Sequence, residues 1–186
     1  HNDARRQRQM CIRDRLYGKE EWLKKLPPYQ GGGEMIDQVT FEKTTYADIP
    51  HKFEAGTPNI AGAVGFGAAI DYINKIGFDF IESHEKDLLK NATDQLKKIT
   101  GMKIYGDIKN KVPVISFNVD KVHHYDLGTI LDKMGIAVRT GQHCCQPIMD
   151  FYGINGTVRA SFAFYNTHRE VDMFVRGVKK AVNMLL

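Results

Sequence analysis

Apolar residues recur at the spacing of an α-helix through the middle of the chain. One helix is predicted from Thr57 to Gly77, because a hydroxyl side chain followed by proline is typical of a helix start and glycine of a helix end. A second long helix is expected to end at Gly101. The apolar positions of the first helix include Ile60, Val64, Ala68 and Ile73, and those of the second are Ile81, Leu88, Leu89, Leu96 and Ile99.

Two further helices are predicted nearer the C-terminus. Asp126 is expected to cap a helix over residues 127–134, which Gly135 ends. Thr167 and Glu170 have the spacing of a capping box, in which each side chain binds the backbone amide of the other residue. The apolar stripe expected on this last helix consists of Val171, Phe174, Val175, Val178 and Val182.

Short apolar runs between these helices predict strands. They lie at 112–119, at 136–139 and at 157–162, with a polar loop over residues 140–147. Pro113 places the first of these strands at a sheet edge or marks its first turn. Nearer the N-terminus the pattern predicts a short helix that Pro27 and Pro28 end, a glycine turn at 31–33, and a strand or hairpin arm at 39–45. The whole pattern is α+β, with two helices leading into a β-α-β-loop-β-α unit.

Composition narrows the class of protein. The chain has 186 residues, of which 42% are hydrophobic, and a formal charge of +4. Most of that charge comes from the arginines of residues 1–15, so the remainder is nearly neutral and predicts no nucleic-acid surface. No apolar run is long enough to span a membrane. Three cysteines, two of them adjacent, do not form a disulfide framework, and we therefore expect a reducing, cytoplasmic location.

The loop over residues 139–147 holds the most informative chemistry. It places two thiols, Cys144 and Cys145, beside Arg139 and His143. Cationic neighbours stabilise a thiolate, which is the nucleophilic form of cysteine. The alternative is a pair of buried, unreactive thiols, which the polar loop disfavours. Adjacent cysteines do not match zinc spacing, so no metal site is expected.

Three other positions are ambiguous on their own. Arg159 lies in the middle of a short apolar strand, where it needs either an acidic partner or a substrate carboxylate. Thr57 precedes free helix amides that suit a phosphate, although most capped helices hold none. The adjacent His123 and His124 are interpreted as surface loop histidines.

Taken together, several segments resemble the C-terminal half of the SufS-type pyridoxal-phosphate cysteine desulfurases, which belong to aminotransferase class V and include selenocysteine lyases. They are residues 31–36 (GGGEMI), 53–59 (FEAGTPN), 139–144 (RTGQHC), 159–161 (RAS) and 165–167 (YNT). The resemblance implies an α/β fold of type I, represented by the end of the large domain and the small C-terminal domain. Residues 16–78 would belong to the large domain and residues 79–186 to the small domain with the cysteine loop.

The resemblance also implies roles for individual residues. Cys144 would be the nucleophile that takes sulfur from L-cysteine, releasing alanine. Arg159 would bind the substrate carboxylate, with Arg139 and His143 beside it. Gly56 and Thr57 would contact the phosphate of the pyridoxal phosphate held by the partner subunit of a homodimer. The glycine loop at 31–33 resembles a hairpin that closes over the neighbouring site, and Gln142 departs from the family, where a second histidine is usual. A sulfur-acceptor protein of iron–sulfur cluster assembly is the implied partner.

One expected feature is missing from the sequence. The family anchors its cofactor on a lysine in a Ser-Gly-His-Lys segment, and the corresponding position is Arg6, whose guanidinium does not form a Schiff base. Residues 1–15 resemble nothing in the family, and we interpret them as an unrelated head on an incomplete enzyme. Two alternatives stay open, a selenocysteine lyase and a non-catalytic module that carries sulfur on Cys144. A redox pair of Cys144 and Cys145 is disfavoured by ring strain.

Overall fold

The structure, a computed structural model, describes residues 16–108 and 110–186, and the predicted head at residues 1–15 lies outside them. The chain divides into two compact units, one up to Lys75 and the other Ile76–Leu186. The sequence places this boundary after residue 78. No helix within the described residues has the length and apolar character of a membrane span.

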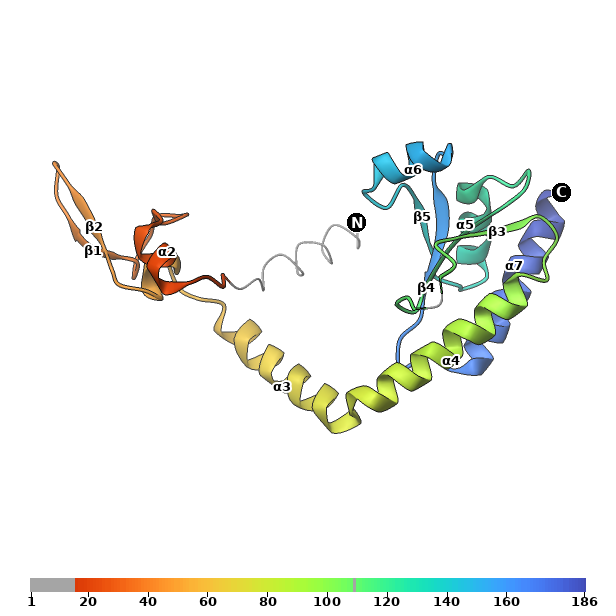
Figure 1. Cartoon of the computed structure of the whole chain (residues 1–186), viewed down its shortest axis with the longest axis horizontal. Helices are drawn as coiled ribbons and strands as arrows, with labels where there is room; N and C mark the ends of the chain where they lie inside the picture. The colour runs from red at the N-terminus through yellow and green to blue at the C-terminus, as the bar shows by residue number, and fades with distance from the viewer. Residues whose placement is uncertain (1–15, 109) are drawn as a thin grey trace. The chain divides into compact units, whose positions relative to one another are not determined.

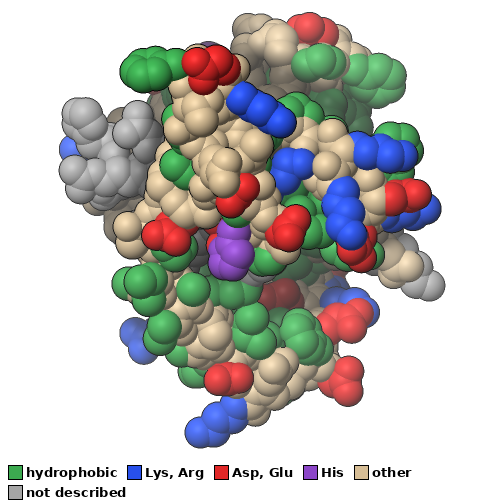
Figure 2. All heavy atoms as spheres, turned by 90° about the vertical axis from the view of Figure 1, so that its left-hand side faces the viewer, with side chains coloured by type: hydrophobic (Ala, Val, Ile, Leu, Met, Phe, Trp, Pro, Cys, Tyr) green, Lys and Arg blue, Asp and Glu red, His purple; other side chains and the backbone are tan. Residues whose placement is uncertain are grey.

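The first unit consists of four short elements and one long helix, and few of its side chains are buried. These are α2 (Glu20–Lys25), β1 (Ile36–Val39), β2 (Thr44–Tyr46), the 3-10 turn η1 (His51–Phe53) and α3 (Ile60–Ile76). Among the residues described here, Met35 is the one buried apolar side chain of this unit. Apolar side chains remain exposed among charged ones on the face shown in Figure 2. The glycine loop contacts Gly56, whose backbone N–H donates to the carbonyl of Gly33 at 2.9 Å.

Two predictions for this unit need correction. The segment at 39–45 is not one continuous arm: Val39 ends β1, residues 40–43 form the hairpin turn, and Thr44 begins β2, which pairs antiparallel with β1. Thr57 does not cap α3. The helix begins at Ile60, and the side chain of Asn59 accepts a hydrogen bond from the backbone N–H of Gly62 at 2.9 Å. Asn59 is therefore the N-cap residue of α3.

The second unit is a four-stranded antiparallel sheet with helices on one side. Its strands are β3 (Met102–Tyr105), β4 (Val114–Val119), β5 (Arg139–Gly141) and β6 (Thr157–Ser161), in the order β3-β4-β6-β5. Its helices are α4 (Phe78–Leu96), α5 (His124–Lys133), α6 (Gln146–Tyr152) and α7 (His168–Leu185). Figure 1 shows α4, α5 and α7 together on one side of the sheet, whereas α6 lies near β5.

Strand alternation gives this sheet one apolar and one polar face. Ile115, Phe117 and Val119 of β4, and Val158 and Ala160 of β6, are buried in the core with the helices. Because neighbouring side chains of a strand point to opposite faces, the residues between them lie on the other face. That face carries Ser116 and Arg159, which are directly opposed across β4 and β6.

The prediction for the last helix is confirmed. Thr167 Oγ1 accepts from the backbone N–H of Glu170, and a Glu170 carboxylate oxygen accepts from the backbone N–H of Thr167 at 2.7 Å. All five residues of its predicted stripe are buried. Phe174 adds edge-to-face contacts with Phe117 and Phe162, each with ring centroids 6.0 Å apart.

Other boundaries in this unit differ from the prediction. The strand β3 was not expected. Helix α5 begins at His124, and His123 caps it in place of Asp126, because its Nδ1 accepts from the backbone N–H of Tyr125. The strand expected at 136–139 lies at Arg139–Gly141, and the loop contains the start of α6. Of the two places predicted for Pro113, the start of the strand agrees with the structure and the sheet edge does not, because Pro113 immediately precedes β4 and β4 is an interior strand.

Candidate functional site

The candidate site is the connection between β5 and α6, which carries Cys144. Its start is fixed by strand pairing, since Gly141 is paired with Thr157 of β6. Its end is fixed by α6, where the carbonyl of Cys145 accepts from the backbone N–H of Ile148 and Met149. Buried Met149 anchors that helix. The thiol thus lies in a connection of four residues between two ordered elements.

The backbone at the thiol has a conformation that side chains disfavour. His143 has φ 57° and Cys144 has φ 60°, two consecutive non-glycine residues in the left-handed region. Each such residue costs on the order of 1–3 kcal/mol and persists only where the surroundings hold it. A turn hydrogen bond from the N–H of Cys145 to the carbonyl of Gln142, at 3.0 Å, closes this segment. At this turn the side chain of Cys144 is exposed to solvent.

Cys144 is exposed and lies next to a guanidinium. Its Sγ is 3.7 Å from Nη2 of Arg139, while Cys145 is half-buried. A guanidinium stabilises negative charge on a neighbouring atom and needs no proton transfer to do so. Cys144 and Arg139 therefore lie next to each other, as the sequence predicts. The alternative of two buried thiols does not describe Cys144.

Arg159 lies directly opposite Arg139 on the paired strands. No carboxylate within the described residues forms an ion pair with either arginine. The Nε of Arg159 is buried and has no hydrogen-bond partner in that part of the chain. The acidic partner considered for Arg159 is thus not found, and its guanidinium can bind an anion. Continuing across the sheet, Ser116 faces Arg159 and Tyr105 faces Ser116, so four strands contribute one row.

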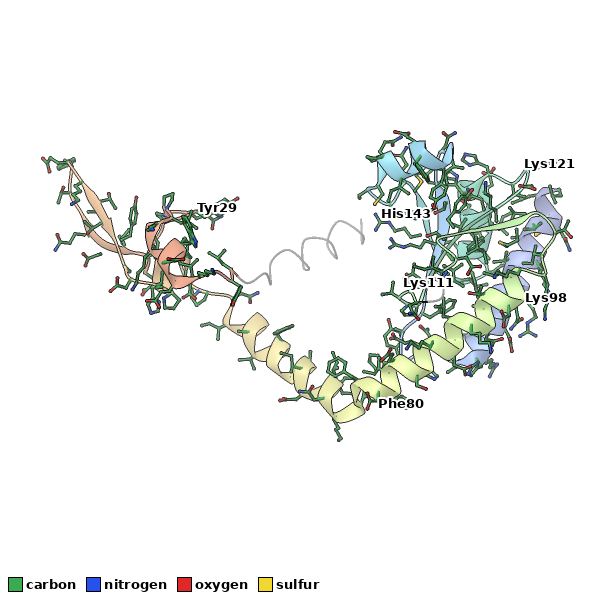
Figure 3. The ribbon with its side chains drawn as sticks, in the orientation of Figure 1. Tyr29, Phe80, Lys98, Lys111, Lys121 and His143 are labelled. Atoms are coloured by element: carbon green, nitrogen blue, oxygen red, sulfur yellow. The ribbon has the colours of Figure 1, made fainter. Side chains whose placement is uncertain are left out.

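His143 is held by a buried threonine. Its Nε2 lies 2.9 Å from the hydroxyl oxygen of Thr157, which is 1% exposed, and its Nδ1 is buried without a partner among the described residues. Figure 3 labels His143 beside the sheet near α6. Burial lowers the pKa of His143, and the positive charges of Arg159 and Arg139 lower it further. The imidazole is therefore neutral at pH 7.

The sequence did not single out Thr157, Ser116 or Tyr105. Thr157 was assigned to a strand, but only the strand register shows that its hydroxyl meets His143. Ser116 alternates with buried Ile115 and Phe117, and this alternation was the available signal that it faces away from the core. The row of side chains from Tyr105 to Arg139 depends on the order of the strands in the sheet. The alternation of apolar and polar residues along a strand does not predict that order.

Gly56 and Thr57 belong to the first unit. Thr57 is exposed, and its hydroxyl has no hydrogen bond to the described residues, whereas the N–H of Gly56 is occupied by the Gly33 carbonyl. Of these two residues, Thr57 therefore has a free group, its hydroxyl, that is suited to contact the phosphate of a cofactor. No group of three or more potential metal ligands is present in the described chain.

Comparison with known proteins agrees with the predicted resemblance. A probable cysteine desulfurase of Xylella fastidiosa is 49% identical over 170 residues, which are 91% of this chain and 41% of that protein. The cysteine desulfurase of Serratia proteamaculans is 46% identical over 171 residues, covering 91% and 42%. The chain thus spans about two fifths of the length of these relatives.

Solved structures give the same result. A cysteine desulfurase from Escherichia coli superposes with a TM-score of 0.85 at 40% identity, covering 92% of this chain and 42% of that one. A cysteine desulfurase from Thermococcus onnurineus gives a TM-score of 0.84 at 42% identity, covering 91% and 43%. The aminotransferase class-V family matches residues 15–174. This match spans most of the sequence, and the chain belongs to the aminotransferase class-V family.

Proposed function

We propose that this chain is the cysteine-bearing part of a pyridoxal-phosphate-dependent cysteine desulfurase. The observation that carries the proposal is the exposed thiol of Cys144, raised on a left-handed turn with its sulfur 3.7 Å from the guanidinium of Arg139. The similarity of more than nine tenths of the chain to cysteine desulfurases supports L-cysteine as the substrate.

In the proposed reaction Cys144 acts as a nucleophile toward the sulfur of the bound substrate. The thiolate donates an electron pair to that sulfur and forms an S–S bond, while the C–S bond of the substrate breaks. The electron pair of the broken bond leaves with the carbon, which takes up a proton and yields alanine. Cys144 then holds the transferred sulfur as a persulfide.

The neighbouring residues would orient the substrate and the thiol. Arg159 has a free guanidinium on the polar face of the sheet, and its planar fork suits both oxygens of a carboxylate. Arg139 would stabilise the negative charge on Cys144 before and after transfer. His143 is neutral and would hold the turn through Thr157.

Pyridoxal phosphate would supply the electron sink for cleavage of the C–S bond when bound. Thr57 has an exposed, free hydroxyl that would suit its phosphate, and in a homodimer this would be the cofactor of the partner subunit. The remaining contacts, including a lysine anchor, would come from the part of the relatives that this chain does not span. We further propose a cytoplasmic enzyme that delivers sulfur to an acceptor protein for iron–sulfur cluster assembly.

A chimera tests the proposal. Residues 16–186 replace the matching segment of the Xylella fastidiosa relative, and alanine formation and protein-bound persulfide are measured after addition of L-cysteine. We expect alanine from the chimera, no persulfide from its Cys144→Ser variant, and retained cofactor absorbance in that variant. Cys145→Ser is the matched control and should keep persulfide formation. An unchanged persulfide yield in Cys144→Ser would overturn the assignment.

The same experiment separates the alternatives. Consumption of selenocysteine without consumption of L-cysteine would indicate a selenocysteine lyase. Uptake of sulfur from inorganic polysulfide by the chain alone, together with an inactive chimera, would indicate a sulfur-carrying module.

A further inference from the structure

His124 is a buried titratable residue that the proposed reaction does not use. It is the first residue of α5 and 6% exposed, and its Nε2 has no hydrogen-bond partner within the described residues. The interpretation of both adjacent histidines as surface residues is therefore wrong for His124, although His123 is exposed. Buried polar atoms are nearly always paired, so an exception needs a physical reason.

The ring of His124 packs against Gly156, and Gly156 in turn lies against Gly141 at the start of the Cys144 loop. A Cβ atom on Gly156 would lie 2.6 Å from Nε2 of His124 and 2.9 Å from the carbonyl carbon of Gly141. Only glycine fits at this close approach. Gly141 is the last residue of β5, where the loop begins, and Gly156 precedes Thr157, whose hydroxyl holds His143. His124 thus packs against the segment that carries Thr157, and through Gly156 it is linked to the start of the loop.

The surroundings of His124 disfavour a charge on its ring. Its ring stacks on that of the capping residue His123, with centroids 4.4 Å apart, and lies tilted against that of Tyr125, at 4.6 Å. Burial lowers the pKa of His124, and His123 lowers it further, whereas Asp126 acts in the opposite direction. On the loop side, His124 interacts electrostatically with His143 and lowers its pKa. Arg159 and Arg139 also lower the pKa of His143. No carboxylate in the described chain forms an ion pair with His124.

We propose that His124 is a positioning residue that keeps Gly141 and Gly156 in place, and with them the Cys144 loop, only while its ring is uncharged. Protonation of the ring puts a positive charge against the backbone at Gly156 and beside His143. The segments then separate, and Arg139 no longer faces the sulfur of Cys144. Acidification therefore weakens the site through His124 as well as through the thiol itself. The inference concerns the loop of the proposed function, but it needs no sulfur transfer to be tested.

The test measures thiol reactivity in the full chain. Cys11→Ser and Cys145→Ser leave Cys144 as the one thiol, and its rate of reaction with 2,2′-dipyridyl disulfide is followed from about pH 4 to 9, across the range where histidine and thiol titrate. We expect an acid-side ionisation in addition to that of the thiol. His124→Asn should remove that ionisation and slow the reaction several-fold at neutral pH. His123→Asn, the exposed neighbour, should keep both. Identical profiles with and without His124 would overturn the proposal.

A second measurement does not depend on the folding of a variant. The ring of His124 and the backbone amide of Cys144 are followed by NMR during an acid titration of the unmodified chain. The proposal expects the amide of Cys144 to shift with the midpoint of His124. A shift that follows only the midpoint of His143, or no shift above the unfolding pH, would overturn it. Both outcomes are independent of whether the chain takes part in desulfurase chemistry.

Discussion

Arg139 and Arg159 face each other directly across β5 and β6, and neither forms an ion pair with a carboxylate of the described residues. Like charges at directly opposed positions destabilise a sheet. A fold that keeps them there retains two paired arginines, one of them beside the thiol of Cys144, as a site for an anion. Such a repulsive pair is expected where a binding site is retained although it lowers the folding stability of the protein.

Removing one of the two charges should stabilise the chain. We predict that Arg139→Gln raises the free energy of unfolding by about 0.5 kcal/mol at low salt, because a cross-strand repulsion disappears. The gain should shrink in about 1 M salt, where the screening length is about 3 Å. Urea titration at both salt concentrations measures it. Arg176→Gln, which changes an exposed arginine of α7, is the control and should leave stability nearly unchanged. A loss of stability in Arg139→Gln would show that repulsion is not the dominant interaction.

The capping box of α7 should be a measurable stabilising feature. Thr167→Ala leaves the N–H of Glu170 without its side-chain acceptor, so we predict a loss of about 1 kcal/mol in the free energy of unfolding. Thr129→Ala is a matched control, because Thr129 is exposed inside α5 and its hydroxyl donates only to the carbonyl of Tyr125. Thermal or urea unfolding compares the two. Equal losses would mean that the cap contributes nothing specific.

The helices with complete local signals could be predicted from the sequence. The last helix has a capping box, a regular apolar stripe and no proline, and its start and buried face were both predicted correctly. Helix α6 was assigned to a loop, because it has seven residues and Pro147 in its first turn. Such a short helix is not stable alone and forms here around the buried Met149.

The candidate site could be predicted in its residues but not in its arrangement. Cys144, Arg139 and His143 are neighbours in sequence, so their meeting was foreseeable. The pairing of Arg159 with Arg139, and of Thr157 with His143, depends on the register of β6 against β5. Register is fixed by packing of both faces of the sheet and by the turn geometry, neither of which a single strand encodes. The burial of His124 arises in the same way, from contact with Gly156.

The stability of the chain should fall as the pH is lowered from neutral. Burial and the two arginines lower the pKa of His143 in the folded state, so the unfolded chain binds the proton more tightly. Stability is then fully present above the unfolded pKa of about 6.5 and is lost as the pH falls through the lower folded value. His143→Gln should reduce this dependence, which urea titrations between about pH 7 and 5 measure. A steeper dependence in the variant would contradict the sign of the shift.

The free guanidinium of Arg159 should bind small anions even in the absence of a substrate. Its Nε is buried without a partner in the described chain, and Arg139 adds a second positive charge across the strand pair. An anion that binds only the folded state raises stability in proportion to the logarithm of its concentration above the dissociation constant. We therefore predict that acetate, at constant ionic strength, raises the unfolding midpoint of the chain and that Arg159→Gln abolishes the rise. Lys180→Gln, a change of an exposed charge on α7, should retain it. An equal rise in the chain and in Arg159→Gln would show that acetate acts elsewhere, and Arg159 would then lose its assignment as the carboxylate-binding residue.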